Sequence, residues 1–275
     1  MDSKKTASAL AKKACSIRDY LNGCEDKEKE KIIEEFRKRI EVHLGGEHPT
    51  DQIYPDTCSQ IIVCSILWLR TISLYGNLKK TNPFVLGLLD FLLFIKARDH
   101  LRVICDEVID YLKKIDLAEL HKKLLKDNKS LLHDFYQHFI KVYDPKIASQ
   151  LGIVYTPDAV VNFIVRASDD IIKKEFGREK GLSDPSVKLE DPFTGSGAFL
   201  MGAVRKVLEG KDQQEQKDII QNHVLPNFSG NELLMTPTIL AHMNLHLLLF
   251  YEFGITLEDG ESFNIVCKDT FEEPE

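Results

Sequence analysis

The sequence lacks an apolar run long enough to cross a membrane, and its N-terminal residues lack the apolar stretch of a signal peptide. The longest apolar runs are Ile61–Leu69 and Phe84–Ile95, and Asp90 interrupts the second. The six cysteines include no Cys-X-X-Cys pair, so neither a structural zinc site nor the disulfide framework of a small secreted domain is indicated. We therefore expect a cytoplasmic protein without a membrane or metal site, whose thiols are reduced and mostly packed in the core.

Positive charge is scarce in the second half of the chain. Residues 1–150 contain 25 Lys and Arg against 22 Asp and Glu, whereas residues 151–275 contain 11 against 21. The whole chain of 275 residues has a formal net charge of −7. Because a surface that grips a nucleic acid duplex normally carries a basic stripe, we do not expect the second half to grip DNA.

Strand-like alternation is absent before about residue 150. Apolar residues recur there at helical spacing, and Asn82-Pro83 is a typical helix start. Helices are expected within residues 1–44, from about residue 50 to residue 72, and over 83–95, 100–125 and 131–143. The first half is therefore predicted to be an all-helical domain, residues 1–145.

After Asp144-Pro145 the pattern changes to alternating strands and helices. A helix is predicted from Pro157, with Thr156 as its cap. Strands are predicted at 187–190, at a segment ending near 232 and at 263–267, with helices between them. This order predicts an α/β fold for residues 146–275, namely half of a doubly wound parallel sheet.

Each predicted strand ends in an acid, and these acids are Asp191, Glu232 and Asp269. In parallel sheets ligands bind outside the carboxyl ends of the strands. The loop after the first strand contains Gly195 and Gly197 but no Lys, which disfavours a phosphate-binding loop, and the missing third glycine disfavours a dinucleotide site. An acid beside a glycine loop suits an amino acid, and further acids suit ribose hydroxyls and a purine amine. Together these features outline S-adenosylmethionine.

The stretch GIVYTP followed by DPFTGSGAFL resembles the cofactor motifs of amino-directed DNA adenine methyltransferases. The likeness is strongest to the methylase region of type ISP and type IIG restriction–modification enzymes. It continues through NHVLPNFSGNELLMTPTILAHMNLHLLL and NIVCKDTF, and covers about residues 131–275. It implies a Rossmann-like, S-adenosylmethionine-dependent methyltransferase that acts on the exocyclic amine of adenine in DNA.

The resemblance also implies a role for each matching residue. Tyr155 and Thr156 would contact the methionine part of the cofactor, and Glu232 would bind the ribose hydroxyls. Asp269 would face the adenine amine, with Phe271 as a candidate wall for the ring. The amino acid end of the cofactor would be held by Asp191, Gly195 and Gly197, in a loop shaped by Pro192 and Phe193.

The family's catalytic motif, Asn or Asp followed by Pro-Pro and an aromatic residue, does not occur in the sequence, and neither do helicase or nuclease motifs. Because this motif follows a fourth strand, we expect it to lie beyond Glu275 and expect these residues to bind cofactor without transferring a methyl group. The alternative is a non-enzymatic cofactor-binding module, or a subunit whose exposed sheet edge is covered by a partner chain or a second copy. In the complete enzyme the partner would be DNA.

Overall fold

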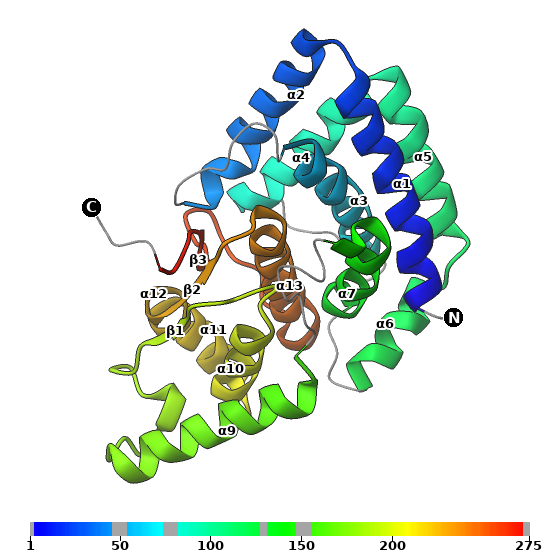
Figure 1. Ribbon diagram of the computed structural model, residues 1–275. Coiled ribbons are helices and arrows are strands. Elements are labelled where there is room, and N and C mark those ends of the chain that lie inside the picture. Colours follow the sequence, from blue (N-terminus) through cyan, green and yellow to red (C-terminus); the bar gives the residue numbers. More distant parts are fainter. Residues whose placement is uncertain (1–2, 46–53, 74–81, 127–130, 147–155, 272–275) are drawn as a thin grey trace. The chain divides into compact units, whose positions relative to one another are not determined.

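The computed structural model describes residues 3–45, 54–73, 82–126, 131–146 and 156–271 (Figure 1). Contacts divide the chain into two compact units, Met1–Val154 and Tyr155–Glu275. Each unit has its own buried apolar residues, as a folding domain requires.

The described part of the first unit is helical. Its elements are α1 (Ser3–Gly23), α2 (Asp26–Arg39), the short 3-10 helix η1 (Glu41–His43), α3 (Tyr54–Ser73), α4 (Pro83–Lys96), α5 (Asp99–Lys113), α6 (Leu117–Lys126) and α7 (Leu131–Tyr143). Helix α1 packs against α3 and α7, and α3 is buried along most of its length. Trp68 on α3 is fully buried, and so are Cys58 and Cys64, which confirms that these thiols are core residues.

The prediction of a single helix over residues 100–125 is wrong. Helix α5 ends at Lys113, and α6 begins at Leu117. The carboxylate of Asp116 accepts a hydrogen bond from the backbone N–H of Glu119 at 2.9 Å, which starts the new helix. The apolar period continues across the break because both helices bury one face, so periodicity alone did not reveal the turn.

The second unit contains a small parallel sheet with strand order β1-β2-β3. The strands are β1 (Leu189–Asp191), β2 (Phe228–Glu232) and β3 (Asn264–Cys267), which confirms the three predicted strands to within two residues. The other elements are α9 (Asp158–Glu175), the 3-10 helix η3 (Gly181–Ser183), α10 (Ala198–Leu208), α11 (Gln213–Ile219), the π-helical turn η4 (Ile220–Val224), α12 (Leu225–Asn227) and α13 (Met235–Phe253).

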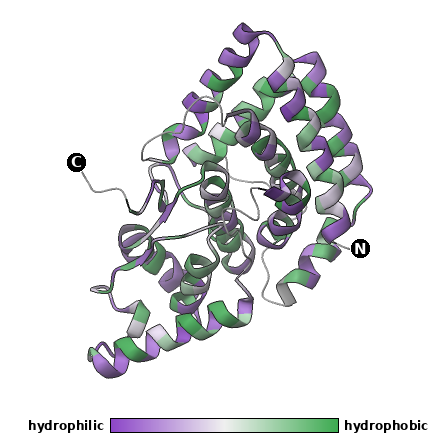
Figure 2. Cartoon of the chain, in the orientation of Figure 1, coloured by the Kyte–Doolittle hydropathy of each residue, from purple (hydrophilic) through white to green (hydrophobic). Residues whose placement is uncertain are grey.

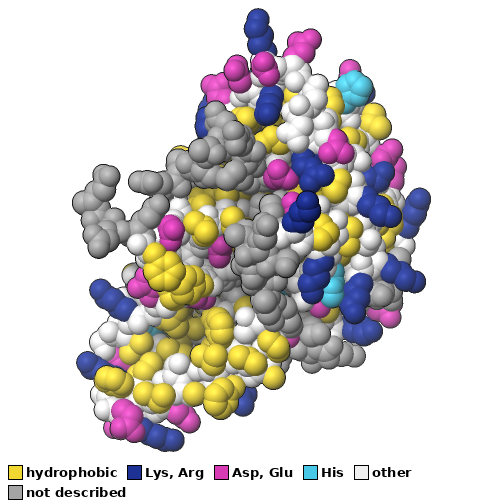
Figure 3. All heavy atoms as spheres, in the orientation of Figure 1, with side chains coloured by type: hydrophobic (Ala, Val, Ile, Leu, Met, Phe, Trp, Pro, Cys, Tyr) yellow, Lys and Arg dark blue, Asp and Glu magenta, His cyan; other side chains and the backbone are white. Residues whose placement is uncertain are grey.

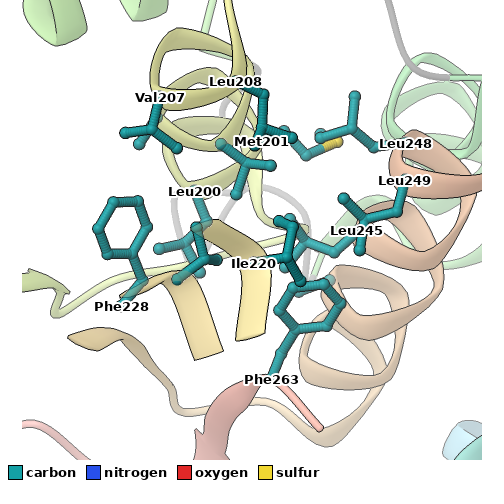
Figure 4. Close-up of a cluster of buried hydrophobic side chains, with 14 of the residues drawn as sticks. Leu200, Met201, Val207, Leu208, Ile220, Phe228, Leu245, Leu248, Leu249 and Phe263 are labelled. Atoms are coloured by element: carbon teal, nitrogen blue, oxygen red, sulfur yellow. The ribbon is translucent and has the colours of Figure 1, made fainter. Parts of the chain in front are cut away.

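Helices α10 and α13 supply most of the core of this unit. Leu200, Val207, Leu245 and Leu249 pack with Phe228 of β2 in the cluster shown in Figure 4. Helix α13 is apolar around most of its surface (Figure 2), as expected for a buried helix. It ends at Phe253 and is capped by Gly254, whose φ of 66° is typical of the residue that follows a helix.

Helix α9 packs on α10 through Val161 and Val165, which approach Gly202 closely. The predicted cap of this helix is wrong. Pro157 rather than Thr156 is in the N-cap position, and no side chain caps the first turn. Helix α9 also carries exposed apolar side chains, including Phe163 and Ile171, in a region where hydrophobic side chains gather on the surface in Figure 3.

Candidate functional site

The carboxyl ends of the three strands meet at one edge of the sheet. Asp191 pairs with Gly230 in the ladder, and Glu232 pairs with Cys267. The segments that follow the strands therefore leave the sheet side by side, with Asp191, Glu232 and Asp269 on neighbouring strand ends. The arrangement matches the place where ligands bind in parallel α/β sheets.

The loop between β1 and α10 has a backbone that only glycine adopts readily. Gly195 and Gly197 have φ angles of 54° and 89°, in the left-handed region. Thr194 holds the loop to the sheet, since its N–H donates to the Asn231 carbonyl and its hydroxyl to the Asp191 carbonyl, both at 2.9 Å. The loop thus forms a fixed turn at the start of a helix, where backbone N–H groups favour an anionic group.

The carboxylate of Glu232 links the end of β2 to this loop. It accepts hydrogen bonds from the backbone N–H groups of Gly195 and Leu234, each at 2.9 Å. Burial and, to a smaller extent, the neighbouring Asp191 charge raise the pKa of Glu232, against backbone N–H groups of Leu234, Gly195 and Leu233 that lower it. The predicted ribose-binding residue is therefore held in a defined position beside the glycine loop.

The carboxylate of Asp191 is only partly satisfied. Its Oδ1 accepts the N–H of Phe193 at 3.2 Å, whereas Oδ2 is buried and has no hydrogen-bond partner among the described residues. Burial raises the pKa of Asp191. Such a group costs free energy unless a partner arrives, so an unpaired buried carboxylate oxygen marks a position for a hydrogen-bond donor.

The segment after β3 contacts the glycine loop. The Thr270 hydroxyl donates to the Pro192 carbonyl at 2.5 Å, and the rings of Phe193 and Phe271 lie 5.6 Å apart. The carboxylate of Asp269 accepts the N–H of Phe271 at 2.9 Å. Both phenylalanines are exposed, with 63% and 81% of their surface accessible, so the loops present a pair of aromatic faces to solvent.

The structure thus brings together Asp191, Pro192, Phe193, Gly195, Gly197, Glu232 and Asp269. Of the other two candidates, Tyr155 lies outside the described residues, and Thr156 is half-buried just ahead of α9. Three further residues hold the loops of this site: Thr194, Thr270 and Asn244, whose amide donates to the Ser196 carbonyl at 2.8 Å. The partners of Thr270 and Asn244, and the Asn231 carbonyl bound by the Thr194 N–H, come from elements distant in the sequence, so the sequence did not indicate these contacts. Nothing in the local pattern marks these three residues.

A cavity of about 560 Å³ lies elsewhere in the second unit, lined by α9, α10 and the segments around η3 and η4. Its lining contains four Lys and four Asp or Glu residues, and Lys206 contacts both Asp169 and Glu209, so its charges largely neutralise one another. His223 on its wall already bonds the Leu182 carbonyl at 2.7 Å. This cavity is therefore not a second candidate for the site at the strand ends.

His242 and His246 are four residues apart on α13, but the described residues contain no cluster of three or more His, Cys, Asp or Glu side chains suited to a metal ion. His242 is buried and its Nε2 lies 3.1 Å from the Ile265 carbonyl. None of the described helices is long and apolar enough to span a membrane.

The fold and the site define a class of protein, an α/β unit whose parallel sheet carries a glycine loop and acidic side chains at its ligand-binding edge. The family model for N-6 DNA methylase matches residues 127–275, and the chain belongs to this family. The predicted resemblance is thereby confirmed. No curated protein matches the chain.

Three solved structures are similar to the chain over 98% of its length. They are the DrdV–DNA complex (21% identity, TM-score 0.68), the ATP-dependent type ISP restriction–modification enzyme LlaBIII bound to DNA (24%, 0.58) and a nuclease-deletion mutant of the type ISP enzyme LlaGI with a DNA substrate mimic (22%, 0.58). The chain covers 25%, 18% and 21% of these proteins respectively, so it spans a quarter or less of their length. At this level of identity the likeness shows a shared fold.

Proposed function

We propose that the strand ends of the second unit bind S-adenosylmethionine, and that the chain supplies the cofactor-binding part of a DNA adenine methyltransferase of a restriction–modification system. In this proposal residues 146–275 form half of a Rossmann-like methyltransferase sheet, and residues 1–145 form its helical domain. Membership of the N-6 DNA methylase family and the fold shared with restriction–modification enzymes support the proposal.

The observation that carries the proposal is the buried Oδ2 of Asp191, which no other described residue hydrogen-bonds, beside a loop with two left-handed glycines. An amino acid offers an ammonium group to the carboxylate and a carboxylate to the N–H groups at the start of α10. The residues present therefore fit the amino acid end of the cofactor.

The other residues fit the nucleoside end. Glu232 would accept hydrogen bonds from the ribose hydroxyls, and Asp269 would accept one from the adenine amine. The exposed rings of Phe193 and Phe271 offer apolar faces against which a purine can stack. Tyr155 and Thr156 would add contacts to the methionine part.

When bound, S-adenosylmethionine supplies a methyl group activated by its positively charged sulfur. The chain's residues would hold the methyl group in a fixed direction. Asp191 would bind the ammonium group on one side of the sulfur, and Glu232 would bind the ribose hydroxyls on the other side. The residues that would bind the target adenine belong to the Asn-Pro-Pro or Asp-Pro-Pro motif, which is not among these 275 residues. DNA would be the partner of the complete enzyme.

Calorimetric titration with S-adenosylmethionine tests the proposal. We expect the chain to bind the cofactor and Asp191→Asn to weaken binding by about tenfold or more, because a charged hydrogen bond is lost. Asp259→Asn, an exposed carboxylate in a turn, is the matched control and should leave the affinity unchanged. No heat from the wild-type chain at millimolar cofactor would refute the proposal.

An assay of methyl incorporation into DNA tests whether these 275 residues bind the cofactor without catalysing methyl transfer. We expect the 275-residue chain to bind cofactor and to incorporate no methyl groups. Efficient methylation of DNA by this chain alone would show that the adenine-binding residues lie within it, and would overturn this part of the proposal.

Among the described residues β1 pairs with β2 alone, so its outer edge offers unpaired backbone groups. We propose that another strand covers this edge, either in a longer chain or in a partner chain. Size-exclusion chromatography with light scattering tests whether the covering strand comes from a partner chain. That version of the proposal predicts a dimer or a complex. A monomer at high protein concentration would contradict it.

A further inference from the structure

Asn244 lies beneath the glycine loop on α13. The residue is buried, with 1% of its surface exposed, and its side-chain amide donates a hydrogen bond to the Ser196 carbonyl at 2.8 Å. Forty-eight residues separate the two partners in the sequence, so this bond ties the middle of α13 to the loop that begins α10.

The backbone of the loop rests directly on the same helix. A Cβ atom added to Gly197 would lie 3.3 Å from the Cβ of Ala241, one turn before Asn244. The N–H of Gly197 donates to the Thr194 carbonyl at 2.9 Å. Both polar groups of the peptide that joins Ser196 to Gly197 are therefore bound within the protein, and this fixes the plane of that peptide.

Three side chains thus hold the loop from outside it: Glu232 from β2, Asn244 from α13, and Thr270 from the segment after β3. Glu232 holds the N–H of Gly195 and also faces the position proposed for the ribose. Asn244 bonds the loop from its inner side and, being buried, does not reach a ligand. A change at Asn244 would consequently act first on the Ser196–Gly197 peptide, next to the start of α10, and not on the carboxylate of Glu232.

We propose that Asn244 is a positioning residue for the amino acid end of the cofactor: its amide holds the Ser196 carbonyl so that the loop beside Asp191 keeps the shape that binds an ammonium and a carboxylate. The inference rests on the proposed function. It assigns the selectivity for the amino acid part of the ligand to a buried hydrogen bond between α13 and the loop.

The experiment compares two ligands on matched variants. Asn244→Asp keeps the volume of the side chain and replaces the amide donor by an acceptor, which repels the Ser196 carbonyl. Thr238→Val is the control, because the Thr238 hydroxyl is also buried on α13 but donates to the Leu234 carbonyl of its own helix, at 2.8 Å. The ligands are S-adenosylmethionine and 5′-methylthioadenosine, which lacks the amino acid end.

We expect Asn244→Asp to weaken binding of S-adenosylmethionine by about tenfold and to leave binding of 5′-methylthioadenosine within about twofold of wild type. Thr238→Val should leave the ratio of the two affinities unchanged, even where it lowers the unfolding temperature. Asn244→Ala should reproduce the selective loss, which shows that the missing donor, and not the added charge, is responsible.

The inference is overturned if Asn244→Asp weakens both ligands equally, or if it changes the ratio no more than Thr238→Val does. If either Asn244 variant does not fold, the other decides the question by the same ratio, and Asn244→Ser, which retains a donor, should restore part of the selectivity. Failure of the wild-type chain to bind either ligand would instead refute the proposed function, so the two failures are distinguishable.

Discussion

At the scale of single residues, Asp191 lowers the stability of the free protein but provides a hydrogen-bond acceptor for a ligand. One of its oxygens is buried and has no hydrogen-bond partner within the part of the chain that the structure describes, and burial raises the pKa of Asp191. The folded state therefore holds the Asp191 proton more tightly than the unfolded chain does. The ionised carboxylate lowers the stability of the free protein, as is common where binding sites are kept ready for a ligand.

This cost predicts an unusual effect of Asp191→Asn on stability. The amide does not ionise, and its oxygen can still accept the N–H of Phe193. At pH 7 we expect the variant to be more stable than wild type in urea unfolding without ligand. The advantage should shrink as the pH falls through the raised pKa of Asp191, and vanish below the unfolded pKa, where wild type is protonated in both states.

The measurement is a series of urea unfolding curves from pH 7 down to the acid range, with Asp259→Asn as the control variant. A variant Asp191→Asn that is less stable than wild type at pH 7 would contradict the assignment of Asp191 as an unpaired buried charge. A difference that does not depend on pH would contradict it as well.

At the scale of elements, the packing of α9 on α10 depends on the absence of a side chain. A Cβ atom on Gly202 would lie 2.8 Å from Cγ1 of Val161 and 3.3 Å from Cγ2 of Val165. Both contacts are with β-branched side chains, which have little rotational freedom in a helix. The sequence pattern predicted both helices, but it could not reveal that they meet at this glycine.

We expect Gly202→Ala to destabilise the second unit by about 1–3 kcal/mol, because overpacking outweighs the helix propensity gained from Ala. Gly23→Ala at the end of α1 is the control, since an added Cβ there meets nothing within 4 Å. Urea unfolding followed by circular dichroism measures both. Equal stability of Gly202→Ala and wild type would show that α9 can move away from α10 without cost.

At the scale of the whole molecule, the strand ends were predictable and the contacts between them were not. Asp191, Glu232 and Asp269 follow recognisable strand patterns, and parallel strands bring their carboxyl ends to one edge. The break before α6 has a local cause, the Asp116 cap, which the apolar periodicity hides, whereas the Asn244 bond depends on a partner 48 residues away.

The division into two units predicts two unfolding transitions in calorimetry, because each unit buries its own core. Gly87→Ala places a Cβ 1.8 Å from the Arg39 carbonyl oxygen, where α4 meets the end of α2, and should lower the transition of the first unit. Gly202→Ala should lower that of the second. A single transition that both variants shift together would show that the units unfold as one.

The contact between Gly230 and Thr194 also limits how this site can change over generations. A Cβ on Gly230 would lie 2.2 Å from the Thr194 hydroxyl oxygen, which itself bonds the Asp191 carbonyl. An alanine at 230 thus requires a smaller residue at 194 and a small shift of Leu200, whose Cδ1 would lie 3.1 Å from the new Cβ. A substitution at one of these two positions alone lowers the stability of the folded unit. We therefore expect homologous sequences to have glycine at 230 together with threonine at 194, or to differ at both positions.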